Sequence, residues 1–495
     1  MNLKKLLILS YCYLIVPNLL FLYFWFDFEY VILPIFFQLV IIFILWPKLN
    51  NTILNEKIEI KNLVYIFVIA VFYVLLSGTG DFFPQIYDFW GHNAKLNNLR
   101  YSNWPVTIPK KNTYFAYYFG YYIVPSSLSY LTGISLKLMN FLFIVTGLFI
   151  AFFLLFIYFK KNIKLLLLAT LISTPSISLL NILTFGYYSK YVFLENKFWL
   201  HDFFKALQWE PHQLVPSIIC ASLVLTEFNY SRKLVYSLLL IPIVLIWSPF
   251  LSISLSLTIL LYYLWIFFFK KDFSILKNFK FIISFFILCI SVIPIAFYLI
   301  SNESSSLLAF MPPTKSLSWN TSFVVFISTN ILIFYFFIFG KYTTVNSKVF
   351  ASSLFLIIIL SSTIRTGVHN DFLIKTTIFP ILIIHFRFAE ELYRRFLSSR
   401  NYHLIGIVFL ISFSGTFSNL LNQLHFLKLE EKALIYKLNK PKKFESYKSI
   451  DKMLLEKYSQ KEALQYRGDV TSIYAKILAK KTLGEKINSV NKSPH

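Results

Sequence analysis

The residues best suited to chemistry lie together in one short polar segment. Residues 87–95 read Tyr-Asp-Phe-Trp-Gly-His-Asn-Ala-Lys. If this segment is helical, Asp88, His92 and Lys95 share one face, because they are four and three residues apart. A carboxylate, an imidazole and an ammonium group so placed suit proton transfer and contact with a phosphate. A helix that lies at a membrane surface with a wet polar face would show the same spacing.

A second polar segment, Glu210-Pro211-His212-Gln213, stands just before an apolar block. Pro211 suits the first turn of a helix, which would place His212 and Gln213 at the helix entrance. The simpler interpretation is a helix cap with aromatic anchoring by the preceding tryptophan. His201 and Asp202 form another polar pair just upstream.

A third polar segment places Arg365 and Lys375 on either side of Asn370 and Asp371. The two cations would meet a phosphate at the mouth of the next helix, where backbone N–H groups already favour anions. In the simpler interpretation, Asn370 or Asp371 caps that helix and Arg365 only extends its charge toward water.

The elements that must position these residues are membrane-spanning helices. The chain has 495 residues, of which 57% are hydrophobic and only 14% charged. The apolar residues come in blocks of roughly 17–25, the length that a helix needs to cross a bilayer. We expect an all-α, polytopic transmembrane helix bundle of about 13 spans, because backbone polar groups in lipid must be satisfied within a helix. Residues 1–421 would form this domain and residues 422–495 a basic, mostly helical tail.

Basic residues between the apolar blocks predict the orientation. Lys4 and Lys5 precede the first block, which indicates a cytoplasmic N-terminus. Residues 79–133 then form the first large extracytoplasmic loop, with short helices of its own. Within it, Tyr114 to Leu131 is apolar enough to span, but a span there would place Lys160 and Lys161 outside. We therefore expect a re-entrant or interface-lying segment.

The net charge of +24 favours membrane lipids over nucleic acid as partners, since the Lys and Arg residues lie mostly between blocks and in the tail. Richness in Lys, Asn, Ile and Phe is typical of an AT-rich bacterial genome, so we expect a bacterial cytoplasmic membrane protein. Few charges lie inside the apolar blocks, which argues against a transporter. No metal-ligand spacing is visible, although the acids and histidines of the outer loops are compatible with a divalent metal.

Several of these segments resemble a group of bacterial polytopic proteins. The resemblance rests on Asp-Phe-Trp-Gly-His-Asn-Ala-Lys-Leu from Asp88, on Asn-Trp-Pro-Val at 103–106 and on Tyr-Tyr-Phe-Gly-Tyr-Tyr-Ile-Val-Pro at 117–125. It extends to Pro211-His212-Gln213 and to Asn370-Asp371, where Lys375 stands in place of the usual arginine. The wider architecture is similar to the GT-C glycosyltransferases, and the tail adds nothing to the likeness.

The resemblance implies an enzyme that takes sugar from a polyprenyl-phosphate donor and passes it to a glycan or lipid acceptor. Asp88 would be the catalytic carboxylate, with Asp81 as second candidate. The remaining implied roles are donor-phosphate or substrate contacts, at His92, Lys95, Glu210, His212, Arg365, Asn370, Asp371 and Lys375. A transporter or flippase, and a polymerase or ligase of lipid-linked glycans, stay open as alternatives.

Overall fold

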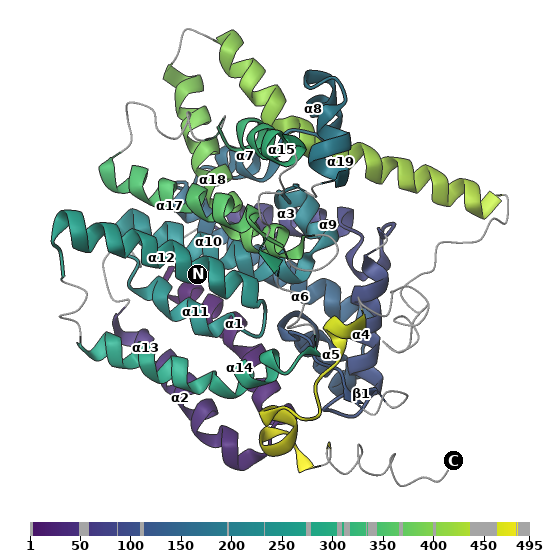
Figure 1. Ribbon diagram of the computed structural model, residues 1–495, viewed down its shortest axis with the longest axis vertical. Coiled ribbons are helices and arrows are strands. Elements are labelled where there is room, and N and C mark those ends of the chain that lie inside the picture. The colour runs from purple at the N-terminus through teal and green to yellow at the C-terminus, as the bar shows by residue number, and fades with distance from the viewer. Residues whose placement is uncertain are drawn as a thin grey trace.

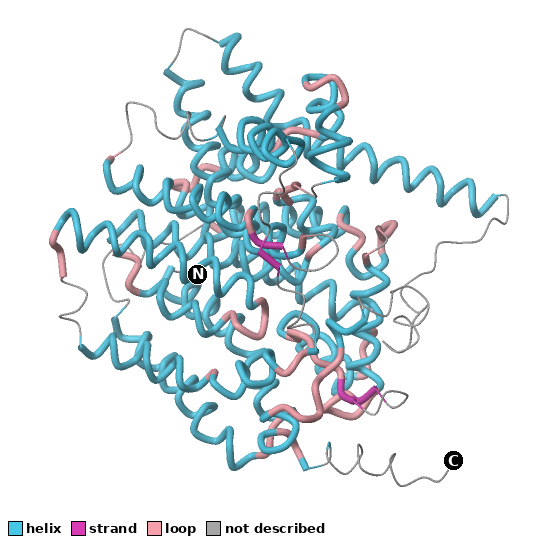
Figure 2. The backbone as a smooth tube through the Cα atoms, viewed as in Figure 1, coloured by secondary structure: helices cyan, strands magenta, loops and turns pink. Residues whose placement is uncertain are grey.

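The computed structural model describes residues 3–48, 59–86, 88–108, 113–195, 198–231, 233–273, 279–303, 309–310, 317–332, 334, 344–365, 370–398, 402–435, 463–481 and 483. Helix makes up most of this part of the chain, and Figure 2 shows the strands confined to two short pairs. These are β1 (Thr107–Ile108) with β2 (Thr113–Tyr114), and β3 (Ala309–Phe310) with β4 (Ile364–Arg365), both antiparallel. The all-α class is therefore confirmed.

The longer helices form the bundle drawn in Figure 1. They are α1 (Leu3–Trp25), α2 (Phe28–Lys48), α3 (Ile60–Leu76), α6 (Leu136–Tyr158), α10 (Pro211–Ser231), α12 (Pro249–Lys270), α13 (Phe279–Ser291), α15 (Leu317–Ile327), α17 (Val345–Ser362), α18 (Asp371–Ser398) and α19 (Tyr402–Ile435). Shorter helices connect them: α4 (Phe89–Tyr101), α5 (Gly120–Thr132), α7 (Ile163–Leu171), α8 (Ile177–Leu183), α9 (Phe203–Trp209), α11 (Leu240–Ile243) and α14 (Ile293–Ile300).

Among the described residues, 7 helices are long and apolar enough to cross a membrane, or 8 if the bent pair α13 and α14 is one span. The protein is thus a multi-pass membrane protein. The expected number of about 13 spans is not confirmed, because several apolar blocks are broken. The block 165–183 divides into α7 and α8 around Ile172–Ser176, and the block before Pro249 holds only the four-residue α11.

Long-range hydrogen bonds explain the break between α7 and α8. Pro175 cannot donate a backbone hydrogen bond. The Ser173 N–H donates to the Ser412 carbonyl oxygen of α19 at 2.7 Å, and the Thr416 N–H of α19 donates to Ser173 Oγ at 3.0 Å. The Ser173 N–H at the break and the Thr416 N–H of α19 are therefore each satisfied by an acceptor of the other segment.

The apolar centre of the bundle lies around α6 and α10, which pack against each other, while α10 also packs against α18. Both helices are buried along most of their length. Helices α1, α3 and α5 cover further sides of α6. Helix α4 and the N-terminal ends of α10 and α18 carry most of the polar residues singled out in the sequence.

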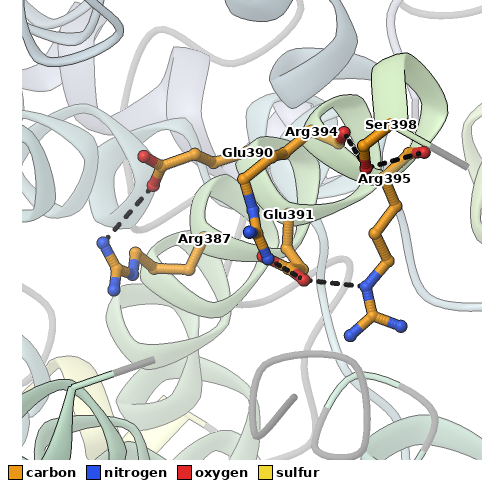
Figure 3. A network of polar contacts seen from close by, with 6 residues as sticks. All are labelled: Arg387, Glu390, Glu391, Arg394, Arg395 and Ser398. Atoms are coloured by element: carbon orange, nitrogen blue, oxygen red, sulfur yellow. Dashed lines mark hydrogen bonds and ion pairs between the residues drawn. The ribbon is translucent and has the colours of Figure 1, made fainter. Parts of the chain in front are cut away.

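Two faces of the bundle can be told apart by their residues. We call the one that holds residues 78–133 the loop face, and the one that holds Lys160 and Lys161 the basic face. Helix α18 reaches the basic face, where Glu390 accepts a hydrogen bond from Tyr158 at 2.9 Å. Figure 3 shows the ion pairs at this end of α18, Arg387 with Glu390 and Glu391 with Arg394 and Arg395.

The loop face is not a flat surface of loops, because part of it enters the bundle. Helix α5 has 13 residues and spans only about 20 Å, too short to cross the hydrocarbon, in agreement with a re-entrant path. The Gly120 N–H donates to the Ile246 carbonyl oxygen at 3.0 Å. Trp247 donates in turn to the carbonyl oxygen of Leu14, near the middle of α1, at 2.8 Å. The break before α12 therefore lies inside the bundle.

The predicted boundary at residue 421 falls inside α19, which continues to Ile435 and projects from the bundle in Figure 1. The helical spacing expected near Ile450 lies outside the described residues. Residues 463–481, which we call the C-terminal segment, contain only short turns of helix and return to the bundle beside α5 and α14. The segment forms isolated β-bridges with Phe26, Phe115 and Asn302.

Candidate functional site

Polar residues from four parts of the chain converge at the loop face. They come from α4, from the turn before α5, from the junction of α9 and α10, and from the start of α18. Most of them are buried, with exposed fractions of 4% for His92, 3% for Lys95 and 2% for His212. The sequence placed these residues in outer loops, but the fold draws them into the protein interior.

The first segment is a helix, as its spacing predicts. Helix α4 begins after Asp88, whose backbone carbonyl accepts the N–H of Gly91 at 3.0 Å and of His92 at 3.3 Å. The Asp88 carboxylate does not cap this helix, and it is half-buried. The negative charge of Asp88 raises the pKa of both Lys95 and Glu210, so Asp88 lies at the edge of the same cluster.

His92 is held on both sides of its ring. Nε2 lies 3.1 Å from the carbonyl oxygen of Trp209, and Nδ1 lies 2.8 Å from the hydroxyl of Tyr122. A carbonyl oxygen can only accept, so Nε2 carries the proton and Nδ1 accepts from Tyr122. Burial and the nearby Lys95 charge lower the pKa of His92 to about 3, so the ring is neutral. Through these hydrogen bonds, His92 connects α4 to the α9–α10 junction.

Lys95 sits in a cage of three tyrosine rings. Its Nζ lies 4.5 Å from the centre of the Tyr117 ring and 5.4 Å from those of Tyr122 and Tyr466. Aromatic faces attract a cation at such distances. Burial, reinforced by the charge of Lys375, lowers the pKa of Lys95 to about 7, while Glu210 and Asp88 oppose that shift. The ammonium is therefore close to half-protonated at neutral pH.

Glu210 and His212 form a second buried pair at the start of α10. Glu210 Oε2 lies 3.3 Å from His212 Nε2, and the hydroxyls of Tyr117 and Tyr118 lie 3.4 Å from the same nitrogen. Burial raises the pKa of Glu210 to about 8, although the charge of Lys375 opposes the rise. Glu210 is thus mostly protonated at neutral pH.

Lys375 is the electrostatic centre of the cluster. Its Nζ lies 3.4 Å from Asp371 Oδ1, one turn earlier on α18, and 5.7 Å from the centre of the Phe250 ring at the start of α12. Its positive charge lowers the pKa of each of Glu210, Lys95 and His92. The sequence predicted that Lys375 and the segment around residue 210 share a site, and the fold brings them together.

Three buried side chains at the N-terminal ends of α10 and α18 are among those whose polar atoms have no hydrogen-bond partner in the part of the chain that the structure describes. These are both amide atoms of Asn370, both amide atoms of Gln213, and Nδ1 of His212. Asn370 therefore does not cap α18, against the simpler interpretation of its position. Buried polar atoms of this kind are normally satisfied by water or by a ligand.

Other predicted site residues lie elsewhere. Asp81 forms an ion pair with Lys137 of α6 at 3.0 Å, which links the loop to α6. Asp202 caps α9 by accepting the Lys205 N–H at 3.0 Å. The backbone of Arg365 pairs in β4, and its side chain lies outside the described residues.

Sequence reasoning missed the tyrosines that surround Lys95. Tyr117 and Tyr122 stand in the Tyr-Tyr-Phe-Gly-Tyr-Tyr run, whose density of hydroxyl-bearing rings was a usable signal. Tyr466 stands in the tail, which showed no motif. The tail adds nothing to the family resemblance, but in the fold the Tyr466 ring faces Lys95.

Among the described residues, no three His, Cys, Asp or Glu side chains are grouped so as to ligate a metal ion. The acids and histidines instead pair with tyrosines, lysines and backbone groups. No protein-family model, curated protein or solved structure matches this chain. The arguments about function therefore rest on its own residues and on the motif resemblance.

Proposed function

We propose that this protein is an integral membrane glycosyltransferase that moves a sugar from a polyprenyl-phosphate-linked donor to a glycan or lipid acceptor. The loop face would be extracytoplasmic, and the N-terminus cytoplasmic, in a bacterial cytoplasmic membrane. The observation that supports the proposal best is the convergence of Asp88, Lys95, Glu210 and Lys375, from three distant parts of the sequence, on one buried polar cluster.

The protonation states favour Asp88 over Glu210 as the base. Glu210 is mostly protonated at neutral pH, and a neutral carboxyl group is a far weaker base than a carboxylate. Asp88 would remove the proton from the acceptor hydroxyl as its oxygen attacks the anomeric carbon. The bond from that carbon to the phosphate oxygen breaks, and the phosphate leaves with the electron pair.

The leaving phosphate gains negative charge, which Lys375 and the charged form of Lys95 would offset. The N-terminal end of α18 adds partial positive charge at the same place. Glu210 and His212 would contact the acceptor, and the unpartnered amides of Gln213 and Asn370 would bind sugar hydroxyls. His92 would hold the N-terminal end of α4, next to Asp88, in place.

A second candidate is transport of lipid-linked glycans. The broken helices favour it, because α7 with α8, and the segment before α12, place irregular backbone inside the bundle. The buried ionisable cluster also removes the sequence-based argument that charges are scarce in the interior. A polymerase or ligase of lipid-linked glycans would use the same site chemistry.

The test is sugar transfer by the purified protein in lipid nanodiscs, with a panel of polyprenyl-phosphate sugars and extracted envelope acceptors. Asp88→Asn is expected to slow transfer by about 10²–10⁴-fold, the usual contribution of a general base. Asp81→Asn is the matched control, since it breaks only the pair with Lys137 and should keep the rate. Full activity in a well-inserted Asp88→Asn protein would contradict the proposed base, and glycan movement without transfer would favour transport.

A further inference from the structure

The C-terminal segment is fastened to the loop face by backbone hydrogen bonds at several points. The Ala116 N–H donates to the Tyr466 carbonyl oxygen at 3.1 Å, and the Gly468 N–H donates to Tyr114 at 2.9 Å. Farther along, the Asp469 N–H donates to Ser301 at 2.7 Å. The turn between α1 and α2 is joined as well, since the Asp27 N–H donates to the Leu478 carbonyl oxygen at 3.2 Å. The segment thus ties together the ends of α1, α14 and the strand before α5.

These bonds bring one tail side chain to the polar cluster. The Tyr466 ring stacks on Tyr117, with ring centres 5.3 Å apart and planes 24° apart, and also contacts Phe115. Its side chain is only 6% exposed. Tyr117 in turn reaches His212 with its hydroxyl. Tyr466 therefore forms one wall of the Lys95 cage and supports the ring that joins the cage to the Glu210–His212 pair.

We propose that Tyr466 is a positioning residue for the Lys95 ammonium, and that the C-terminal segment is a structural part of the site. The ring excludes water from Lys95 and offers its face to the cation, so the contribution comes from the ring and not from the hydroxyl. Burial, which Tyr466 helps to provide, is also the main cause of the lowered pKa of Lys95.

The cage sets the protonation state of Lys95 whether the site transfers sugar or transports a lipid-linked glycan. Its consequence for catalysis rests on the proposed function: a Lys95 whose charge is set by the cage would tune how well the leaving phosphate is stabilised. The two claims can be separated, because the state of Lys95 can be measured without any sugar donor.

The experiment is competitive labelling of lysines by acetic anhydride on the full-length protein in nanodiscs, with each peptide quantified by mass spectrometry between pH 6 and 10. Exposed Lys160 provides the internal reference. In the wild-type protein, Lys95 should be labelled far more slowly than Lys160. Tyr466→Ala should move the Lys95 titration to higher pH. At alkaline pH, where the amine is deprotonated in both proteins, it should raise the Lys95 labelling rate on the order of ten-fold, because the ring no longer covers the amine.

Two variants complete the test. Tyr466→Phe keeps the ring and should retain wild-type labelling of Lys95. Ile473→Ala, on the same segment but 51% exposed, should also leave labelling unchanged. Wild-type labelling in Tyr466→Ala, or an equal rise in Tyr466→Phe, would overturn the proposal. If Tyr466→Ala alters the labelling of Lys95 but the wild-type protein transfers no sugar, the result supports the cage and contradicts the proposed glycosyltransferase function.

Discussion

At the scale of single residues, burial displaces Glu210 and Lys95 in opposite directions, and both displacements affect stability. The pKa of Glu210 rises from 4.5 to about 8, and the pKa of Lys95 falls from 10.5 to about 7. The folded protein therefore holds the Glu210 proton longer, and releases the Lys95 proton earlier, than the unfolded chain. Each group then makes the free energy of unfolding depend on pH.

The sign of each dependence follows from which state binds more protons. Between pH 4.5 and 8 the folded state holds the extra Glu210 proton, so stability falls as pH rises. Between pH 7 and 10.5 the unfolded state holds the extra Lys95 proton, so stability rises with pH. We predict that these two groups together lower the melting temperature of the detergent-solubilised protein most near pH 7–8, while buried His92, whose pKa is lowered from 6.5 to about 3, adds an opposite slope between those two values. Glu210→Gln should reduce the change of melting temperature with pH on the acidic side, and Lys95→Met should reduce it on the alkaline side. An unchanged pH dependence in either variant would contradict the corresponding pKa shift.

At the scale of elements, the contact between α5 and the break before α12 depends on a glycine. A Cβ atom at Gly120 would lie 2.7 Å from the Trp247 Cα, and backbone cannot yield as a flexible side chain can. Trp247 is itself fixed by its bond to Leu14. The close approach fixes the start of α5, directly after Tyr117 and Tyr118 in the chain.

Gly120→Ala is therefore expected to destabilise the protein by about 1–3 kcal/mol, the usual cost of an overpacked core. Gly406→Ala is the matched control, since nothing lies within 4 Å of a Cβ atom there, and a mid-helix alanine should be neutral or stabilising by about 0.5–1 kcal/mol. Thermal unfolding of both variants in one detergent measures the difference. Equal melting temperatures would show that α5 and Trp247 do not pack this closely.

The elements that could be predicted from sequence are those whose signal is local. The unbroken apolar run of α6 is visible in the sequence, and Pro211 marked the start of α10. Pro175 is a local signal for a break between α7 and α8, but no local pattern encodes the hydrogen bond from Ser173 to Ser412, far along the chain. Within the site, the spacing in α4 predicted a shared face, whereas Tyr466 reaches the cluster only through tertiary contacts that no local pattern encodes.

At the scale of the whole molecule, the contacts of the C-terminal segment require it to lie on the same side of the membrane as residues 79–133. Positive charge in the tail argues for the opposite side, but that bias applies weakly to long segments. The hydrogen bonds to Tyr114, Ser301 and Asp27 settle only which parts lie together. The side on which they lie is a separate prediction.

Single cysteines can test that prediction in intact cells, with a membrane-impermeant maleimide. Cysteines at Tyr101 and Ile473, both well exposed, should be labelled from outside, whereas one at Phe396, at the basic-face end of α18, should be labelled only after lysis. The native cysteines lie within helices of the bundle, and their replacement by alanine gives the background. Labelling of Tyr101 and Ile473 positions from different sides would contradict the fold, and labelling of both only after lysis would reverse the orientation.

The position of Tyr466 near the end of the chain has a consequence for how the protein is made. Translation delivers the N-terminal part first, so α4 and the tyrosines before α5 enter the membrane while the C-terminal segment is still unsynthesised. The wall that Tyr466 provides can close only after residues 463–481 have left the ribosome and reached the loop face. Until residues 463–481 dock, the Lys95 cage lacks one of its three rings, so the site is completed by a segment that is made long after α4.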